Sequence, residues 1–143
     1  MSRFHPHESL GFHCNLTLKA FIGSWEEKLK GTGISPAQVC ALAQLIDSGA
    51  LSQSKLVERL SIRPATGVRL VDRMERDGWV ERQPDPQDGR VKLVVLTKRA
   101  TEIWENISQA GRTVMDQAYQ GIPPAEIETV KRVLEKVRKN LKA

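Results

Sequence analysis

A segment without helical periodicity interrupts an otherwise helical chain. Residues 83–90, QPDPQDGR, lie between two strand-like runs at 79–82 and 91–96. Prolines cannot donate hydrogen bonds to a strand ladder, and an Asp-Gly pair is typical of turns in which glycine can take a positive φ. The pattern therefore predicts one β-hairpin with a stiffened tip, set among helices.

Helix signals fill the N-terminal third of the chain. Apolar residues recur every three or four positions from about residue 8 to residue 30, and the glycines of 31–33 end this pattern. Ser35 is a typical N-cap, and Pro36 follows it at the first helical position. A second helix is therefore expected from Pro36 to the Ser-Gly pair at 48–49.

Two short helices should come next. Ser52 caps the first, which is expected to end near residues 61–62, and Pro64 begins the second, which should end at 77–78. Three-residue spacing puts an apolar side on the second helix, made of Val68, Val71 and Met74. Two short helices separated by a few residues indicate a helix-turn-helix.

Helical periodicity returns after the hairpin. Thr97 is a good N-cap, and residues 121–124, GIPP, separate the helix that follows it from a last one. The last helix carries a short heptad seam at Ile127, Val130, Leu134, Val137 and Leu141. A seam of about two heptads is too short for a stable isolated coiled coil, so we expect it to pack on the N-terminal helix of a second copy.

An arginine ridge runs along the second helix of the pair, at Arg69, Arg73 and Arg76, away from its expected apolar side. A helix in the major groove presents its first residues to base edges and its later cations to phosphates. We therefore expect Ala65, Thr66 and Arg69 to lie nearest the bases. Arg73 is expected at a phosphate.

Three further positions fit a DNA surface. Ser52 and Ser54 combine hydroxyls with the free amides of a helix start, which suits a phosphate. Arg90 at the hairpin tip can enter the minor groove, where the negative potential is strong. Gly67 costs about 1 kcal/mol relative to alanine inside a helix. It allows the backbone to approach either DNA or the preceding helix, and both explanations stay open.

Composition sets broader limits. A length of 143 residues predicts a single domain, 1–143, and a net charge of +5 permits a polyanionic partner. No apolar run is long enough to span a bilayer and the start of the chain lacks a signal-peptide core, so we expect a cytoplasmic protein. Two cysteines make no disulfide framework. No phosphate loop, nucleophile-base pair or paired carboxylates mark an enzyme, and no cofactor or metal is expected.

The central stretch, LSQSKLVERLSIRPATGVRLVDRMERDGWVERQPDPQDGRVKLVVLT, resembles the MarR (multiple antibiotic resistance) family of winged-helix transcription regulators. Its most specific parts are LVDRMERDGWVER and the wing-like DPQDGR followed by VVLT. The resemblance implies a mainly α fold with a small β-hairpin wing. It places a winged helix-turn-helix at about 35–97 and dimerisation helices at about 8–33 and 98–143. It further implies a homodimeric repressor that reads a pseudo-palindromic operator.

The resemblance also assigns roles to residues. Arg90 matches the wing arginine that reaches the minor groove, Asp88 matches the aspartate that orients it, and Thr66 and Arg69 fall on recognition-helix positions. The chain departs from the family pattern at Gly67, Gly89 and Ala100. Family members often respond to phenolic or lipophilic ligands. The candidates for lining a ligand pocket are four aromatic residues: Phe12, Phe21, Trp25 and Trp104. Aromatic residues at helical spacing are more often part of the core.

Other functions stay open at this point. Cys14, beside His13, raises a redox-sensing regulator as an alternative, although inert packing is the simpler interpretation. His5 and His7, together with His13 and Cys14, offer metal-ligand types without a marked spacing. A helical protein-interaction module without specific DNA binding is the remaining alternative. The arginine at a stiffened hairpin tip argues against it, and the deep groove of A-form RNA argues against an RNA target.

Overall fold

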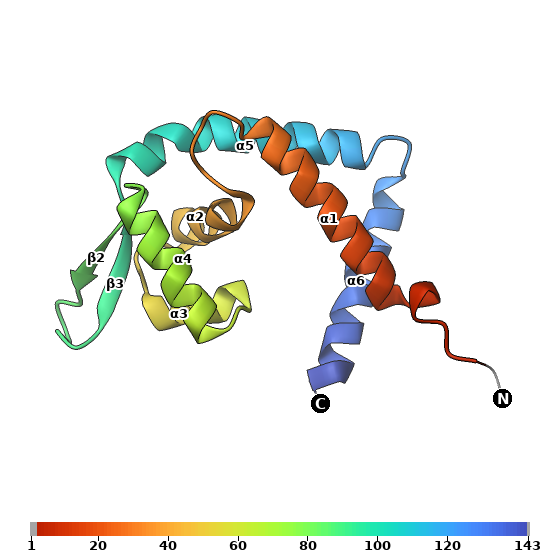
Figure 1. Cartoon of the computed structure of the whole chain (residues 1–143), viewed down its shortest axis with the longest axis horizontal. Helices are drawn as coiled ribbons and strands as arrows, with labels where there is room; N and C mark the ends of the chain where they lie inside the picture. Colours follow the sequence, from red (N-terminus) through yellow and green to blue (C-terminus); the bar gives the residue numbers. More distant parts are fainter. Residues whose placement is uncertain (1–2, 143) are drawn as a thin grey trace.

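The computed structural model describes residues 3–142, so the outermost residues of the expected domain 1–143 lie outside the described residues. The fold is mainly helical with one small antiparallel sheet, as the sequence predicts (Figure 1). In chain order its elements are η1 (Pro6–Glu8), α1 (Leu10–Lys28), α2 (Pro36–Ser48), β1 (Leu51–Ser52), α3 (Gln53–Leu60), α4 (Pro64–Arg76), β2 (Val80–Pro84), β3 (Lys92–Leu96), α5 (Lys98–Ala118) and α6 (Pro124–Lys142).

The predicted helix caps are confirmed. Ser35 forms a capping box with Gln38 at the start of α2. The hydroxyl of Ser52 accepts a hydrogen bond from the Lys55 amide at 3.2 Å, and that of Thr97 accepts one from the Ala100 amide at 3.3 Å. The first helix begins at Leu10, two residues later than expected, because Ser9 supplies its N-cap.

The sheet has the order β1-β3-β2, with both pairs antiparallel. The hairpin is confirmed, but β2 runs two residues further into the predicted tip than expected: its register extends from Val80 opposite Leu96 to Pro84 opposite Lys92. Strand β2 is an edge strand, where a proline is tolerated. Strand β1 was not predicted, because two residues are too few to show strand alternation. Gly89 does not use a positive φ; among the described glycines, this conformation occurs at Gly31, Gly33, Gly49, Gly78 and Gly121.

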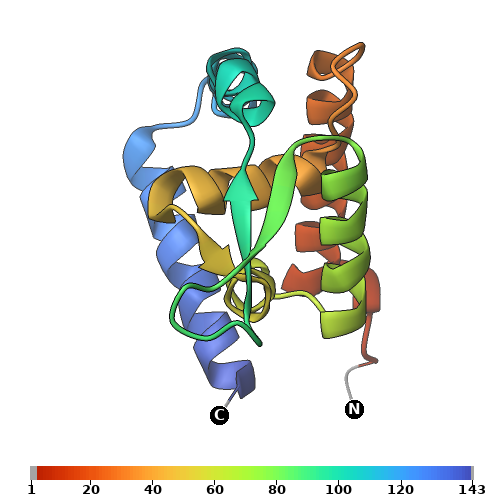
Figure 2. The ribbon, with the colours of Figure 1, turned by 90° about the vertical axis from the view of Figure 1, so that its left-hand side faces the viewer.

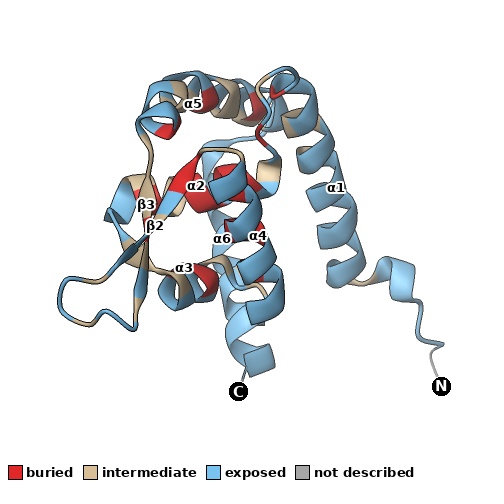
Figure 3. Cartoon of the chain, turned by 60° about the vertical axis from the view of Figure 1, so that its left-hand side comes forward, coloured by how far each residue is buried: buried red, intermediate tan, exposed pale blue. Residues whose placement is uncertain are grey.

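Most of the hydrophobic core lies in what we call the winged part, residues 35–97 (Figure 3). The core also includes Leu29 and Ile34, which precede this part, and it reaches Ile107 near the middle of α5. Trp79 is 1% exposed, and Leu42 and Met74 are fully buried. The prediction for Val68 was wrong: this residue is 41% exposed, whereas Leu70 on the same helix is 4% exposed. Besides Leu70, the buried positions of α4 include Gly67, Val71 and Met74.

Gly67 explains how α3 and α4 approach each other. A Cβ atom at this position would overlap the side chain of Val57 on α3. The glycine therefore serves the packing of the two helices, which decides between the two explanations that the sequence leaves open.

Helices α1 and α6, which we call the terminal helices, lie mostly outside the winged part, which α1 touches near its C-terminal end through Trp25. Helix α5 runs along one side of the molecule, and α1 and α6 descend from it on opposite sides (Figure 2). Both helices lie wholly within the described residues, and neither contains a buried residue. Helix α1 packs on α5, where Trp25 faces Gly111. None of the described helices combines the length and the apolar composition that a membrane crossing needs.

Candidate nucleic-acid interface

Helix α4 presents its polar side outward. Proline at the first helical position starts the helix, and the spacing of its buried residues turns the opposite face to solvent. Ala65, Thr66, Arg69 and Arg73 are all exposed. Within residues 3–142, neither Arg69 nor Arg73 forms an ion pair at 4.0 Å or less. These guanidinium groups are therefore available to an anionic partner.

The acidic residues of α4 are held by Arg82, which sequence reasoning missed as a functional residue. Its guanidinium donates from Nη2 to Asp72 at 2.6 Å and from Nη1 to Glu75 at 3.1 Å. Its Nε donates to the side-chain oxygen of Gln53 at 2.9 Å. The signal in the sequence is the strand alternation: Arg82 lies on the same face of β2 as buried Val80.

The wing consists of β2, β3 and the loop between them, and its tip is shaped by aspartates. The Asp88 carboxylate accepts hydrogen bonds from the backbone amide of Arg90 and from its Nε, both at 3.1 Å. Asp85 accepts a hydrogen bond from the Gln87 amide at 2.8 Å. The side chain of Arg90 is 92% exposed, so its guanidinium group is accessible to a partner while Asp88 holds it at Nε.

These hydrogen bonds also set the charge of the tip. Donation from the side chain and the backbone of Arg90 lowers the pKa of Asp88 below its ordinary value of 3.8. The carboxylate therefore stays ionised at neutral pH and holds Arg90 as a charge-assisted pair.

The start of α3 carries the two predicted serines. The Ser52 hydroxyl is occupied as the N-cap and lies 3.4 Å from the Ser54 hydroxyl. Ser54 is exposed. The N-terminal end of α4, the wing tip and α3 lie together at the lower end of the winged part in Figure 2. The structure thus brings the three elements that carry the predicted DNA-binding residues to one side of the winged part.

A polar junction joins α4 to α2 and α5 behind this surface. The buried Gln38 side chain donates to the Asp77 carboxylate at 3.1 Å, and this hydrogen bond is the main reason that the pKa of Asp77 is lowered. Arg99 donates to the Asp77 carbonyl oxygen, and its guanidinium lies 4.0 Å from the centroid of the Trp79 ring. The junction fixes the C-terminal end of α4.

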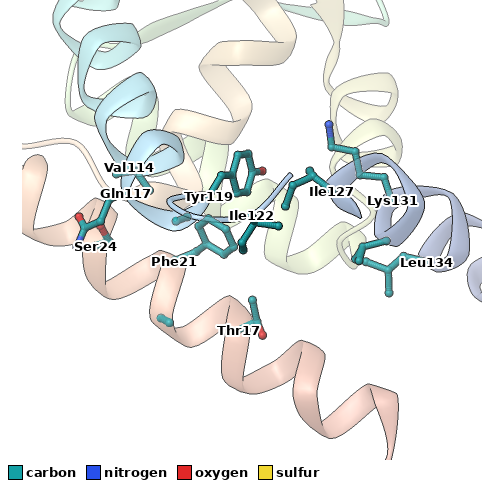
Figure 4. Close-up of a pocket in the computed structure, with 13 residues that line it drawn as sticks. Thr17, Phe21, Ser24, Val114, Gln117, Tyr119, Ile122, Ile127, Lys131 and Leu134 are labelled. Atoms are coloured by element: carbon teal, nitrogen blue, oxygen red, sulfur yellow. The ribbon is translucent and has the colours of Figure 1, made fainter. Parts of the chain in front are cut away.

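A cavity of about 580 Å³ opens between α1, α5 and α6 (Figure 4). Its lining is mainly apolar and includes Phe21, Val114, Ile127, Val130 and Leu134, with polar groups from Ser24, Tyr119 and Lys131. Of the four aromatic residues proposed for a ligand pocket, the structure brings Phe21 to this cavity. Trp25 and Trp104 pack against the core instead, and Phe12 is 39% exposed near the start of α1.

The residues behind the redox and metal alternatives lie at the N-terminal end. Cys14 is exposed on α1. The rings of His5 and His7 meet edge to face with centroids 5.6 Å apart. Across residues 3–142, no cluster of three or more His, Cys, Asp or Glu side chains has the arrangement of a metal site.

Comparisons with known proteins agree with this geometry. Residues 32–91 match the model of the MarR family. The multiple antibiotic resistance protein MarR of Escherichia coli (strain K12) is 30% identical over 112 residues, which cover 78% of this chain and 78% of that protein.

Solved structures match nearly the whole chain. A mutant E. coli MarR complexed with operator DNA superposes with a TM-score of 0.85 at 27% identity, covering 96% of this chain and 98% of that one. BpsR of Bordetella bronchiseptica, whose DNA binding is regulated by 6-hydroxynicotinic acid, gives a TM-score of 0.86 at 23% identity, with coverage of 96% and 98%. The chain belongs to the MarR family of transcriptional regulators.

Proposed function

We propose that this protein is a homodimeric repressor that binds duplex DNA sequence-specifically in the cytoplasm and has no catalytic role. The observation that carries the proposal is the pairing of two exposed elements on one side of the winged part. These are the outer face of α4 and Arg90, which Asp88 orients at the wing tip. E. coli MarR, with the same fold, has been crystallised with operator DNA.

In the proposed complex, α4 enters the major groove. Thr66 and Arg69 contact base edges, Ala65 lies beside them, and Arg73 contacts a phosphate. Ser54 and the first amides of α3 hold a second phosphate. Two winged parts of a dimer then read half-sites about one helical turn apart.

A second copy completes the molecule by covering the terminal helices. Exposed apolar side chains on α1 and α6 include Leu16, Leu18, Ile22, Val130 and Val133. An apolar surface of this extent, carried by two helices without a buried residue, is what a partner helix pair covers in a dimer.

We also propose that a small lipophilic or phenolic ligand modulates DNA binding from the cavity between α1, α5 and α6. An apolar lining with a few polar groups is typical of such sites, and DNA binding by BpsR is regulated by a small aromatic acid. Thermal unfolding in the presence of a panel of phenolic compounds tests this: a ligand that raises the melting temperature should also weaken DNA binding.

DNA binding is tested by fluorescence anisotropy on the DNA upstream of the protein's own coding region, against a scrambled duplex, at several salt concentrations. We expect a preference for the native duplex and a steep loss of affinity with salt. If the native duplex is not preferred, a selection from random duplexes decides whether a specific operator exists. Failure of that selection to enrich any sequence would refute the proposal.

Two variants test the proposed contacts. Arg90→Ala should weaken binding without loss of folding, because the charge at the wing tip is removed. Arg69→Ala should cost about 1–3 kcal/mol and relax base preference at one position. Arg112→Ala is the matched control, since it removes an equal charge from α5, where Arg112 pairs with Glu105. An Arg69 variant that keeps full discrimination between operator and mutated sites would remove this residue from base reading.

A further inference from the structure

Arg82 joins three elements of the proposed DNA-binding surface. It lies on β2, its guanidinium bonds Asp72 and Glu75 on α4, and its Nε bonds Gln53 at the start of α3. The backbone amide of Arg82 also donates to Glu75, at 3.0 Å. The three side-chain contacts give each nitrogen of the Arg82 guanidinium a partner. We call these four residues the clasp.

The shielding of Arg82 distinguishes the clasp from ordinary surface ion pairs. The side chain of Arg82 is 19% exposed, whereas that of Arg90 is 92% exposed. A largely shielded arginine with several partners keeps a fixed position, while an exposed pair contributes little. The clasp thus fixes β2 against α4 through side chains, in addition to the backbone ladder that joins β2 to β3.

The charges in the clasp need an explanation if α4 faces DNA. Asp72 and Glu75 are 58% and 44% exposed on the same helix as Arg69 and Arg73. Carboxylates beside a phosphate backbone repel it, so they weaken binding unless they have another role. Their contacts with Arg82 supply that role.

We propose that Arg82 is a positioning residue that sets the wing relative to the recognition helix, so that Arg90 and α4 reach their two grooves at the same time. This inference rests on the proposed DNA-binding function. It assigns Asp72 and Glu75 to holding Arg82 rather than to contact with DNA. Arg90 then contributes its full share of affinity only when the clasp is intact.

The test uses the full-length dimer and a duplex that the wild-type protein selects from a random library. Dissociation constants are measured for the wild type, Arg82→Met, Arg90→Ala and the double variant. Arg82→Met should weaken binding, and Arg90→Ala should cost less in its background than in the wild type. Residues coupled in this way differ from additivity by about 2- to 100-fold. A role in folding alone would lower the melting temperature and leave the two effects additive.

Glu75→Ala removes a partner of Arg82 instead of Arg82 itself, and it tests the inference if Arg82→Met does not fold. Removing a carboxylate near DNA should tighten binding by charge alone, but the clasp predicts weaker binding. Glu81→Ala is the control, because it removes the same charge from the neighbouring, exposed position of β2. It should leave affinity unchanged or raise it slightly.

The outcomes separate this inference from the function on which it rests. A folded Arg82→Met protein with wild-type affinity would overturn it, as would strict additivity with Arg90→Ala or tighter binding by Glu75→Ala. A wild-type protein that selects no duplex would instead overturn the proposed function, and the role of Arg82 with it.

Discussion

The winged part and the terminal helices of this chain differ in how far they bury their apolar residues. In the winged part, Leu42, Val71 and Met74 are completely buried by neighbouring elements of the same chain. In the terminal helices, Val130 is 54% exposed and Leu141 is 81% exposed. The winged part therefore has a closed core, to which Leu29, Ile34 and the first half of α5 also contribute, whereas the terminal helices leave apolar area for another surface to cover.

This difference assigns separate tasks to the two regions. A closed core lets α4 and the wing keep a fixed geometry before DNA arrives, which lowers the entropy cost of binding. An open apolar face makes the stability of the terminal helices depend on a second copy, and hence on protein concentration. Changes in one region should thus leave the other intact.

The largest expected effect comes from placing a charge on the open face. Val130→Glu should dissociate the dimer, because a carboxylate buried without a partner costs on the order of several kcal/mol, and each copy carries one. Analytical ultracentrifugation should show a monomer, and affinity for a two-half-site operator should fall. Far-ultraviolet circular dichroism should still show a helical protein, because the winged part stays folded.

Thr129→Glu supplies the control for this variant. Thr129 is the adjacent, exposed residue, and its hydroxyl donates to the Ala125 carbonyl oxygen within α6. The same added charge should leave the dimer intact there. Dissociation by both variants would mean that added negative charge alone, rather than the apolar face, controls assembly.

A smaller effect is expected within the winged part. Leu70→Ala should lower the free energy of unfolding by about 2–5 kcal/mol, because it leaves a cavity in a closed core. Val68→Ala, two residues earlier on the same helix, should change it by no more than about 0.5 kcal/mol. Urea denaturation measures both. Equal losses would show that Val68 is buried in solution, as its spacing predicted.

The sequence predicted the helices and the hairpin well because their signals are local. Caps such as Ser35 and Thr97 and helix-starting prolines such as Pro64 act within one turn of chain. Val68 was misplaced because its three-residue spacing with Val71 and Met74 defines an apolar face equally well without Leu70. The packing of α3 on α4 decides whether the face with Val68 or the face with Leu70 is buried. The periodicity of α4 alone does not show how α3 packs.

The candidate site likewise contains contacts that the sequence predicts locally and contacts that it does not. Asp88 and Arg90 are two residues apart, so their contact follows from the turn between them. The contacts of Arg82 join residues 7, 10 and 29 positions away in the chain. A ladder register and a helix orientation are needed before such a cluster can be seen. Strand alternation alone indicates that Arg82 faces inward, but not which carboxylates it meets.

The smallest expected effect concerns acid stability and compares one carboxylate from each region. Asp77 in the winged part has a lowered pKa because buried Gln38 donates to it, and Glu135 on α6 has one because exposed Lys139 donates to it. A lowered pKa in the folded state adds stability above the unfolded-state value, near 3.8 for Asp77, and this stability is lost as the pH falls through the folded value. Asp77→Asn should therefore be less stable than the wild type at pH 7, and the difference should shrink as the pH falls below 4. Urea denaturation across this pH range measures the difference, with Glu135→Gln as the comparison.

Added salt separates the two carboxylates. Because both side chains of the Glu135–Lys139 pair are exposed, salt should remove the contribution of Glu135 to stability first. A contribution from Asp77 that disappears at the same salt concentration would show that the junction with Gln38 is no better shielded than a surface pair.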